Sequence, residues 1–175
     1  MPWRGKPLVR HAAELIDSME FSQFVVVLGS DSDSTGSLLN DLKCELVINT
    51  EWAKGQGRST SIGVKQLQPI IDAAIFFVAD QPKISRNLID SIMMAGKTHH
   101  EEIIVPYCQG KRRNPVLFKR STFADLAELD AEQGGRSIFP GHSLFEMEWL
   151  SHEEFTDVDT LDDYQAIMSQ DEEYT

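Results

Sequence analysis

Cysteine is scarce in this chain of 175 residues, which contains only Cys44 and Cys108. The two form no close-spaced metal or redox motif, and they do not make the disulfide framework of a small secreted domain. We therefore expect a protein of the reducing cytoplasm, in which both thiols are packing residues.

The chain also has no long apolar run and has fewer basic than acidic residues. No segment approaches the ~18 to 20 apolar residues that span a bilayer, and the start lacks the layout of a secretory signal. The 28 acidic and 16 basic side chains give a net charge of −12, which repels a nucleic acid backbone unless the cations are clustered. We expect no membrane span and no nucleic acid partner. The short basic run Lys111-Arg112-Arg113 suits a small anion better than a duplex.

In other respects the composition is that of an ordinary globular protein, with 41% hydrophobic and 25% charged residues. A chain of this length is large enough for one domain with a sizeable core. We expect this domain to span residues 1–168. Acidic residues accumulate after Glu146, and residues 169–175 are expected to form a solvated acidic tail.

One stretch, Asp72 to Pro82, organises the prediction. Its run of aromatic and β-branched residues, stopped by polar residues and a proline, predicts a strand buried on both faces of a parallel sheet. Asp80 would lie at the carboxyl end of this strand, the edge at which open α/β sheets bind ligands. A carboxylate there is a suitable ligand for Mg²⁺. The alternative is that Asp80 merely caps the segment that follows.

The rest of the chain alternates between helical and strand patterns. Helices are predicted at residues 8–19, from Ser30–Ser34 to about Leu42, at 86–95 after a Ser85 cap, up to about Leu129 after a Ser121 or Thr122 cap, and up to about Met168 after a Thr160–Asp163 capping box. Strands are predicted at residues 23–28, 44–49, 102–106, 116–118 and 144–149, the third and fourth of them forming a hairpin-like flap.

A glycine-rich loop precedes the segment that begins at Arg58. Gly55, Gln56 and Gly57 lead into hydroxyl side chains that include Ser59. A helix N-terminus offers free amides and a favourable dipole, so this stretch is a candidate anion or ribose site. A Ser or Thr N-cap after a flexible loop would explain the same pattern.

Together these motifs resemble the MobA-like nucleotidyltransferase family, and within it the molybdenum cofactor cytidylyltransferase branch. The resemblance depends on the order and spacing of short segments along nearly the whole chain. The segments are Pro2–Ala12 with its Gly-Lys-Pro-Leu, Val25–Gly29, Asn49 with Trp52, Gly55–Ser59, Ala79–Pro82, Asn114–Phe118, Gly134–Arg136, and Asp157–Thr160 with Asp163 and Tyr164.

The resemblance implies a Rossmann-like three-layer α/β/α sandwich of the nucleotide-diphospho-sugar transferase type. It also implies a reaction: CMP passes from CTP to a phosphorylated acceptor such as molybdopterin or the molybdenum cofactor, and pyrophosphate is released. A molybdoenzyme or its chaperone would be a protein partner. By the same resemblance, Asp80 would be the catalytic Mg²⁺ ligand, with Asp159 as a second metal contact; Gly57 and Ser59 would bind the nucleoside, and Lys111, Asn114 and Pro115 would face the acceptor.

One departure from the family pattern bears on activity. Family members open with a strand and a Leu-Ala-Ala-Gly loop, followed by an Arg and a Lys, which cradle the triphosphate; none of this precedes Pro2 here. That strand would be central in the sheet, so we expect two neighbouring strands to lack a backbone partner. Two hypotheses remain: a working cytidylyltransferase, or a catalytically inactive remnant that binds a nucleotide or pterin.

Overall fold

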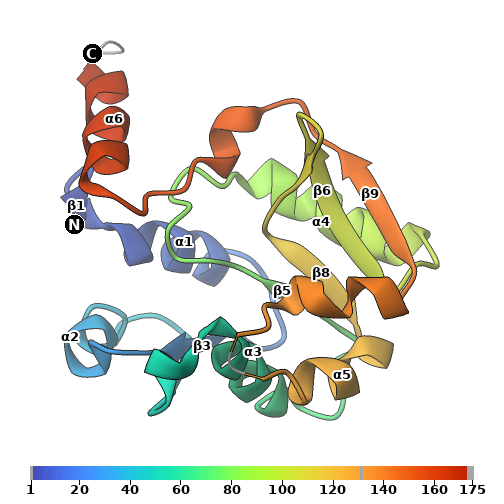
Figure 1. The fold of residues 1–175 in the computed structure, drawn as a ribbon. Helices are drawn as coiled ribbons and strands as arrows, with labels where there is room; N and C mark the ends of the chain where they lie inside the picture. Colours follow the sequence, from blue (N-terminus) through green and yellow to red (C-terminus); the bar gives the residue numbers. More distant parts are fainter. Residues whose placement is uncertain (1, 131, 173–175) are drawn as a thin grey trace.

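The sheet of this protein is in two pieces. The computed structural model describes residues 2–130 and 132–172 (Figure 1). The first piece is a parallel pair, β3 (Val25–Leu28) and β4 (Glu45–Ile48). The second has five strands: β5 (Ala73–Phe76), β8 (Val116–Lys119), β6 (Ile103–Cys108), β7 (Lys111–Arg112) and β9 (Leu144–Glu148). A short antiparallel pair, β1 (Pro2–Trp3) and β2 (Lys6–Pro7), opens the described chain.

Helices cover both faces of these strands. The helices are α1 (Leu8–Asp17), α2 (Ser32–Ser37), α3 (Gln56–Lys65), α4 (Arg86–Thr98), α5 (Phe123–Ala127) and α6 (Leu161–Glu172), with 3-10 turns at Trp52–Lys54, Arg120–Thr122, Gly135–Gly141 and His152–Phe155. None of the helices within the described ranges is long and apolar enough to cross a bilayer.

Neighbouring residues of the five-stranded sheet point to opposite faces, as the period of a strand requires. Ile104 and Leu117 pack with the apolar side of α4, whereas Ile103 and Phe118 pack with Leu126 of α5. The residues between these strands and the helices are fully or nearly fully buried. The sheet is therefore the middle layer of three.

The central strand departs from the prediction. We expected a strand buried on both faces of a parallel sheet, but β5 pairs antiparallel with β8 and is only half-buried along most of its length. Within the described residues, no strand pairs with the other edge of β5 or with the free edge of β3. A cavity of about 1050 Å³ separates the two edges. The burial prediction was wrong because no strand fills this space.

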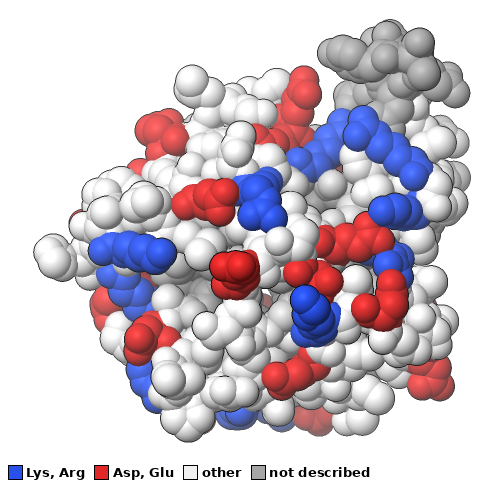
Figure 2. All heavy atoms as spheres, turned by 180° about the vertical axis from the view of Figure 1, so that it is seen from behind, with Lys and Arg blue, Asp and Glu red and all other residues white. Residues whose placement is uncertain are grey.

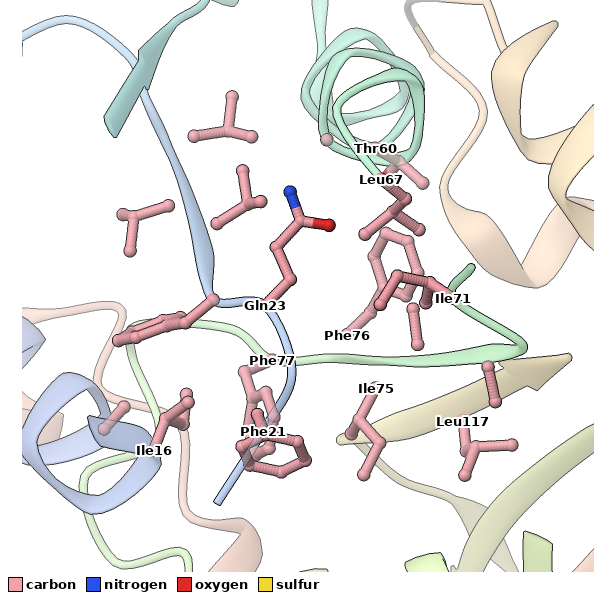
Figure 3. A pocket seen from close by; sticks show the side chains of 18 of the residues that line it. Ile16, Phe21, Gln23, Thr60, Leu67, Ile71, Ile75, Phe76, Phe77 and Leu117 are labelled. Atoms are coloured by element: carbon pink, nitrogen blue, oxygen red, sulfur yellow. The ribbon is translucent and has the colours of Figure 1, made fainter. Parts of the chain in front are cut away.

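Helices α1 and α3 close the cavity from opposite sides. Figure 3 shows Ile16 of α1 on one side and Thr60 of α3 on the other, with Phe76 and Phe77 of the central stretch between them. Just before β3, the Gln23 side chain hydrogen-bonds to the backbone of residues 66 and 68, which precede β5. The beginnings of the two strands are thereby held on the same side of the cavity.

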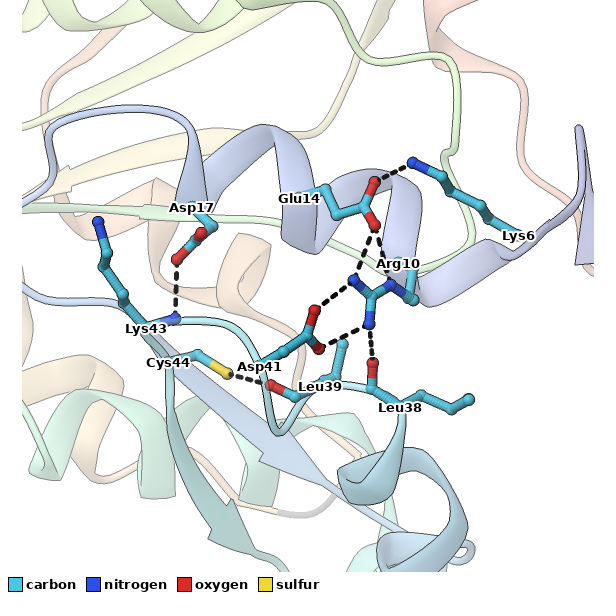
Figure 4. A network of polar contacts seen from close by, with 9 residues as sticks. All are labelled: Lys6, Arg10, Glu14, Asp17, Leu38, Leu39, Asp41, Lys43 and Cys44. Carbon is cyan, nitrogen blue, oxygen red and sulfur yellow. Dashed lines mark hydrogen bonds and ion pairs between the residues drawn. The ribbon is translucent and has the colours of Figure 1, made fainter.

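A polar network fixes the β3–β4 piece to α1 (Figure 4). Arg10 of α1 forms a bidentate ion pair with Asp41, donates to the carbonyl of Leu38 and pairs with Glu14. The hydrogen bond from Arg10 lowers the pKa of Asp41 to about 2. Because Asp41 is exposed, we expect this network to position the β3–β4 piece more than to stabilise it. On the face shown in Figure 2, cationic and acidic side chains are likewise close to one another, with no large area of one charge.

Several local predictions are confirmed. The Ser85 hydroxyl accepts a hydrogen bond from the Leu88 amide and caps α4. Thr160 and Asp163 form the reciprocal bonds of a capping box before α6. The strand predicted at 144–149 is β9, with Glu146 and Glu148 exposed, and residues of β6 and β8 pair antiparallel as the predicted flap.

Other boundaries were wrong. Helix α2 ends at Ser37 rather than near Leu42, since its Ser-rich sequence and Gly36 have low helix propensity. The Thr122 hydroxyl donates to the carbonyl of Lys119 and does not cap α5. Helix α6 continues to Glu172, past its predicted end near Met168. Residues 173–175 of the predicted tail lie outside the described residues.

A histidine between two carboxylates gives a pH-dependent contribution to stability. His142 Nε2 lies 2.8 Å from Asp125 of α5, and Nδ1 lies 3.2 Å from Glu102. Burial would lower the pKa of His142, but the two carboxylates outweigh it and the pKa is raised. The stabilisation is therefore complete below the unfolded pKa of about 6.5 and is lost as the pH rises through the folded pKa.

As the pH rises through the folded pKa of His142, we expect the unfolding temperature of the wild type to fall relative to that of His142→Gln. Thermal unfolding of both proteins between about pH 5 and pH 8 tests this. Parallel pH profiles for the two proteins would contradict it.

Candidate active site

Asp80 lies just beyond β5, and a distant segment is joined to it. The carbonyl of Asp80 accepts a hydrogen bond of 2.9 Å from the amide of Val158. This bond places Asp157 and Asp159, the neighbours of Val158, next to the carboxyl end of the central strand. The structure thus brings together Asp80 and Asp159, the two carboxylates predicted to contact metal.

The carboxylate of Asp80 is poorly compensated by the protein. Its Oδ1 is buried and has no hydrogen-bond partner. Burial, together with the charges of Asp157 and Asp159, raises its pKa, although a backbone hydrogen bond opposes the rise. Gln81, which is buried, donates from Nε2 to Asp157 Oδ1 at 2.7 Å and holds that carboxylate in place. Such a group of carboxylates is stabilised by a cation.

The donor set suits a hard divalent cation that keeps other ligands. Within the described residues, no three His, Cys, Asp or Glu side chains are arranged to hold a metal ion among themselves. Mg²⁺ is commonly bound by only one or two carboxylates, with phosphate oxygens and water completing its octahedron. Asp80 with its unpartnered Oδ1, supported by Asp159, fits that mode of binding.

A second cavity, of about 970 Å³, opens in front of these carboxylates. Asp80, Asp159, Lys111 and Asn114 all line it, so four of the predicted site residues share one cavity. Pro115 is buried beside Asn114, to which it is joined by a cis peptide bond. The cations Arg112, Arg113 and Arg136 also line this cavity.

Ser59 faces the cavity between β3 and β5 rather than the second cavity. Its hydroxyl accepts a 3.0 Å hydrogen bond from the side chain of Asn49, which is fully buried. Helix α3 begins at Gln56 after Gly55 and has no side-chain cap, so the alternative of a Ser or Thr N-cap was wrong.

Helix α3 also links the two cavities. Gln56 and Thr60 line both. Sequence reasoning did not single them out, but their spacing of four residues, which puts two side chains on one helix face, was a usable signal. Sequence reasoning also missed the role of Gln81 in holding Asp157; the position of Gln81 next to Asp80 could have pointed to it.

Gly57 is required by packing. A Cβ at this position would lie 1.9 Å from the carbonyl oxygen of Asp130 and 2.3 Å from that of Gln133. We expect Gly57→Ala to lower the free energy of unfolding by about 1–3 kcal/mol, because backbone on one side must move. Denaturant unfolding measures this, with Gly141→Ala as the matched control, since a Cβ there meets nothing within 4 Å. Equal stability of the two variants would contradict the prediction.

Comparison with known proteins identifies the fold. A family described as the MobA-like NTP transferase domain matches residues 1–146. No match was found among curated proteins. A Mycobacterium tuberculosis H37Rv protein, solved as a complex with manganese, superposes with a TM-score of 0.80 at 19% identity, covering 97% of this chain and 89% of its own.

Two further structures carry names that describe reactions or pathways. The 4-diphosphocytidyl-2C-methyl-D-erythritol synthase of Anaerococcus prevotii has a TM-score of 0.81 at 12% identity, covering 98% of this chain and 88% of its own. Molybdopterin-guanine dinucleotide biosynthesis protein A of Archaeoglobus fulgidus has a TM-score of 0.72 at 12% identity, with 99% and 89% covered. The predicted α/β fold of the nucleotidyltransferase type is confirmed, and the inactive-remnant alternative is not favoured.

Proposed function

The chain belongs to the MobA-like NTP transferase domain family, and we propose on that basis that it transfers CMP from CTP to a phosphorylated acceptor. Molybdopterin or the molybdenum cofactor is the acceptor we propose, with Mg²⁺ as the cofactor and pyrophosphate as the second product. The observation that carries the proposal is the buried Oδ1 of Asp80, which has no hydrogen-bond partner among the described residues and belongs to a side chain lining a cavity that several cations also line.

The reaction needs positioning and charge neutralisation more than proton transfer. A phosphate oxygen of the acceptor attacks the α-phosphorus of CTP and forms the new P–O bond, while the bond from the α-phosphorus to the β-phosphate oxygen breaks and pyrophosphate leaves with its electron pair. A phosphate nucleophile is already ionised near pH 7, so no general base is required. Bound Mg²⁺ would neutralise the phosphate charge that develops.

Each predicted residue then has a defined task. Asp80, with Asp159, holds the cation at the carboxyl end of β5. Lys111 and Asn114, which line the same cavity, act on the acceptor together with the neighbouring Pro115. Gly57 and Ser59, at the start of α3, are proposed to bind the nucleoside; the packing role of Gly57 is compatible with this, since its lack of a side chain also lets backbone approach closely.

Triphosphate binding in this family depends on a glycine-rich loop that follows a strand, and that motif is not among the 175 residues. We infer that its strand belongs in the cavity between β3 and β5, because both edges there lack a partner within the described residues. Activity would accordingly require this strand and loop. The setting we propose is the cytoplasm, since both cysteines are free thiols, with a molybdoenzyme or its chaperone as receiver of the product.

Thermal unfolding with Mg²⁺ and each of CTP, GTP and ATP is the first test. A ligand at about 100 times its Kd should add roughly 2.7 kcal/mol of stability. A rise with CTP above that with the other nucleotides supports the proposal, and formation of pyrophosphate in the presence of the acceptor would then establish transfer. Equal responses to the three nucleotides would overturn the choice of CTP.

A further inference from the structure

Four cations line the second cavity, in a chain whose net charge is −12. They come from two segments: the β7 loop supplies Lys111, Arg112 and Arg113, and the segment after two glycines supplies Arg136. Arg112 is compensated, because its Nε donates to Glu146 at 2.7 Å. The other two arginines differ from it.

Arg113 is half-buried and, among the described residues, has no carboxylate partner. Its guanidinium lies 5.9 Å from the centre of the Phe155 ring, and its Nε is buried with no hydrogen-bond acceptor. A buried donor without an acceptor costs free energy. Arg113 lines the second cavity and is only half-buried, so a ligand bound there can contact its side chain.

Arg136 is exposed, and among the described residues it makes no ion pair within hydrogen-bonding distance. Partial desolvation and the charge of Arg113 lower its pKa, the charge of Asp157 opposes this, and Arg112 adds a smaller lowering effect. Two guanidinium groups thus face one cavity and repel each other. An anion bound between them would offset this repulsion.

We propose that Arg113 and Arg136 together bind a dianionic phosphate monoester group, the group by which the acceptor is held. The existence of the anion site rests on these two residues alone, and only its assignment to the acceptor rests on the proposed function. A phosphate monoester offers three terminal oxygens and a charge of about −1.5 to −2 near pH 7. These oxygens match two guanidinium forks better than a single carboxylate does.

Asp157 joins this site to the carboxylate end of the cavity. Its charge acts on Arg136 and also on Asp80, and Gln81 fixes its side chain. A phosphate held by Arg113 and Arg136 would therefore lie beside Asp157, toward Asp80. An acceptor held by this phosphate would lie next to a nucleotide whose own phosphates are bound at Asp80, as transfer requires.

Binding of inorganic phosphate to the chain, with a chelator present and no nucleotide, tests the site directly. We expect calorimetry to give saturable binding to the wild type and a loss of affinity of about tenfold or more for Arg136→Gln, since an anion held by two guanidinium groups loses one of them. Because Arg136 is exposed, this variant should fold, whereas Arg113→Gln removes a side chain that packs on Phe155. Arg136→Lys keeps the charge without the fork and should fall between.

Lys65→Gln is the matched control, since Lys65 is an exposed cation at the end of α3 that lines neither cavity. It should bind phosphate as the wild type does. Equal affinity of Arg136→Gln and the wild type would overturn the proposal, as would failure of the wild type to bind phosphate. Equal losses in Arg136→Gln and Lys65→Gln would reduce the effect to net charge and overturn it too.

Failure of the proposed function would look different. If no nucleotide is transferred but phosphate binding depends on Arg136, the anion site is supported and the proposed reaction is contradicted. If CMP is transferred, Arg136→Gln should raise the KM for the acceptor and leave the KM for CTP unchanged. Transfer with an unchanged acceptor KM would remove Arg136 from acceptor binding while leaving the reaction intact.

Discussion

Asp80→Asn is expected to abolish metal-dependent nucleotide transfer while leaving the protein folded and at least as stable as the wild type. The loss of activity follows from the role of Asp80 as the carboxylate beyond β5 whose Oδ1 has no partner among the described residues. Metal neutralisation of developing charge is worth several kcal/mol, so we expect a loss of about 10³-fold in turnover in any active form of the protein.

The effect on stability has the opposite sign from that of most carboxylate replacements. The pKa of Asp80 is raised in the folded protein by burial and by Asp157 and Asp159. The folded state therefore holds the proton more tightly than the unfolded state. At neutral pH the ionised side chain costs stability, and this cost disappears as the pH falls below the unfolded pKa of about 3.9. Asparagine removes the charge and with it the cost.

Metal affinity provides a readout that does not need turnover. Titration of the chain with Mg²⁺ or Mn²⁺ should show weaker binding in Asp80→Asn, and wild-type binding should weaken with acid at a higher pH than that of an ordinary aspartate. Asp90→Asn is the matched control, because Asp90 is an exposed carboxylate on α4. Unchanged metal affinity and turnover in Asp80→Asn would remove Asp80 from the mechanism.

Local chemistry determined which parts of the fold were predictable. The caps at Ser85 and Thr160 need only a hydroxyl and a nearby amide. In β9, the alternation of apolar and acidic residues indicates a strand with one face toward solvent. The extent of α2 was not predictable in the same way, since propensity competes there with a turn. The partner of β5 was not predictable either: a run of apolar residues says that a strand is buried, and not which strand lies beside it.

The site shows the same division. The position of Asp80 follows from its place at the end of an apolar run, and the cationic run at Lys111 is visible in the sequence. The meeting of Asp80 with Asp159 depends on the bond from the Val158 amide, which no local pattern encodes; only the family resemblance suggested it. The pairing of Arg113 with Arg136 likewise requires that two loops face one cavity.

The largest effect on stability is expected from filling the cavity between β3 and β5. An apolar strand of about five residues, fused ahead of residue 1 through a flexible Gly/Ser linker, would find an unpaired backbone edge on each side. Trp3 packs with Val158, whose amide bonds to Asp80, so the first described residues, Pro2 and Trp3, lie toward the carboxyl end of β5. The carboxyl end of an inserted strand parallel to β5 would lie on that same side of the cavity, where the linker begins.

The sizes of the opposing terms favour insertion. New backbone hydrogen bonds contribute ~0.5–1.5 kcal/mol each, and each buried apolar side chain contributes roughly 1.5–3 kcal/mol. Ordering the added residues costs about 1–2 kcal/mol each for the backbone. Each kcal/mol in favour of the filled state raises the unfolding temperature of a chain of this size by about 2–4 °C.

A matched fusion in which the central residues of the added strand are Asp and Pro is the control, because it keeps the linker and the length but can neither pair nor be buried. Hydrogen exchange at Val25–Leu28 and Ala73–Phe76 should slow only with the intact strand, since these are the edges it would cover. Equal unfolding temperatures for the two fusions would show that the cavity does not accept a strand. A rise accompanied by dimer formation would assign the effect to pairing between copies and would contradict insertion.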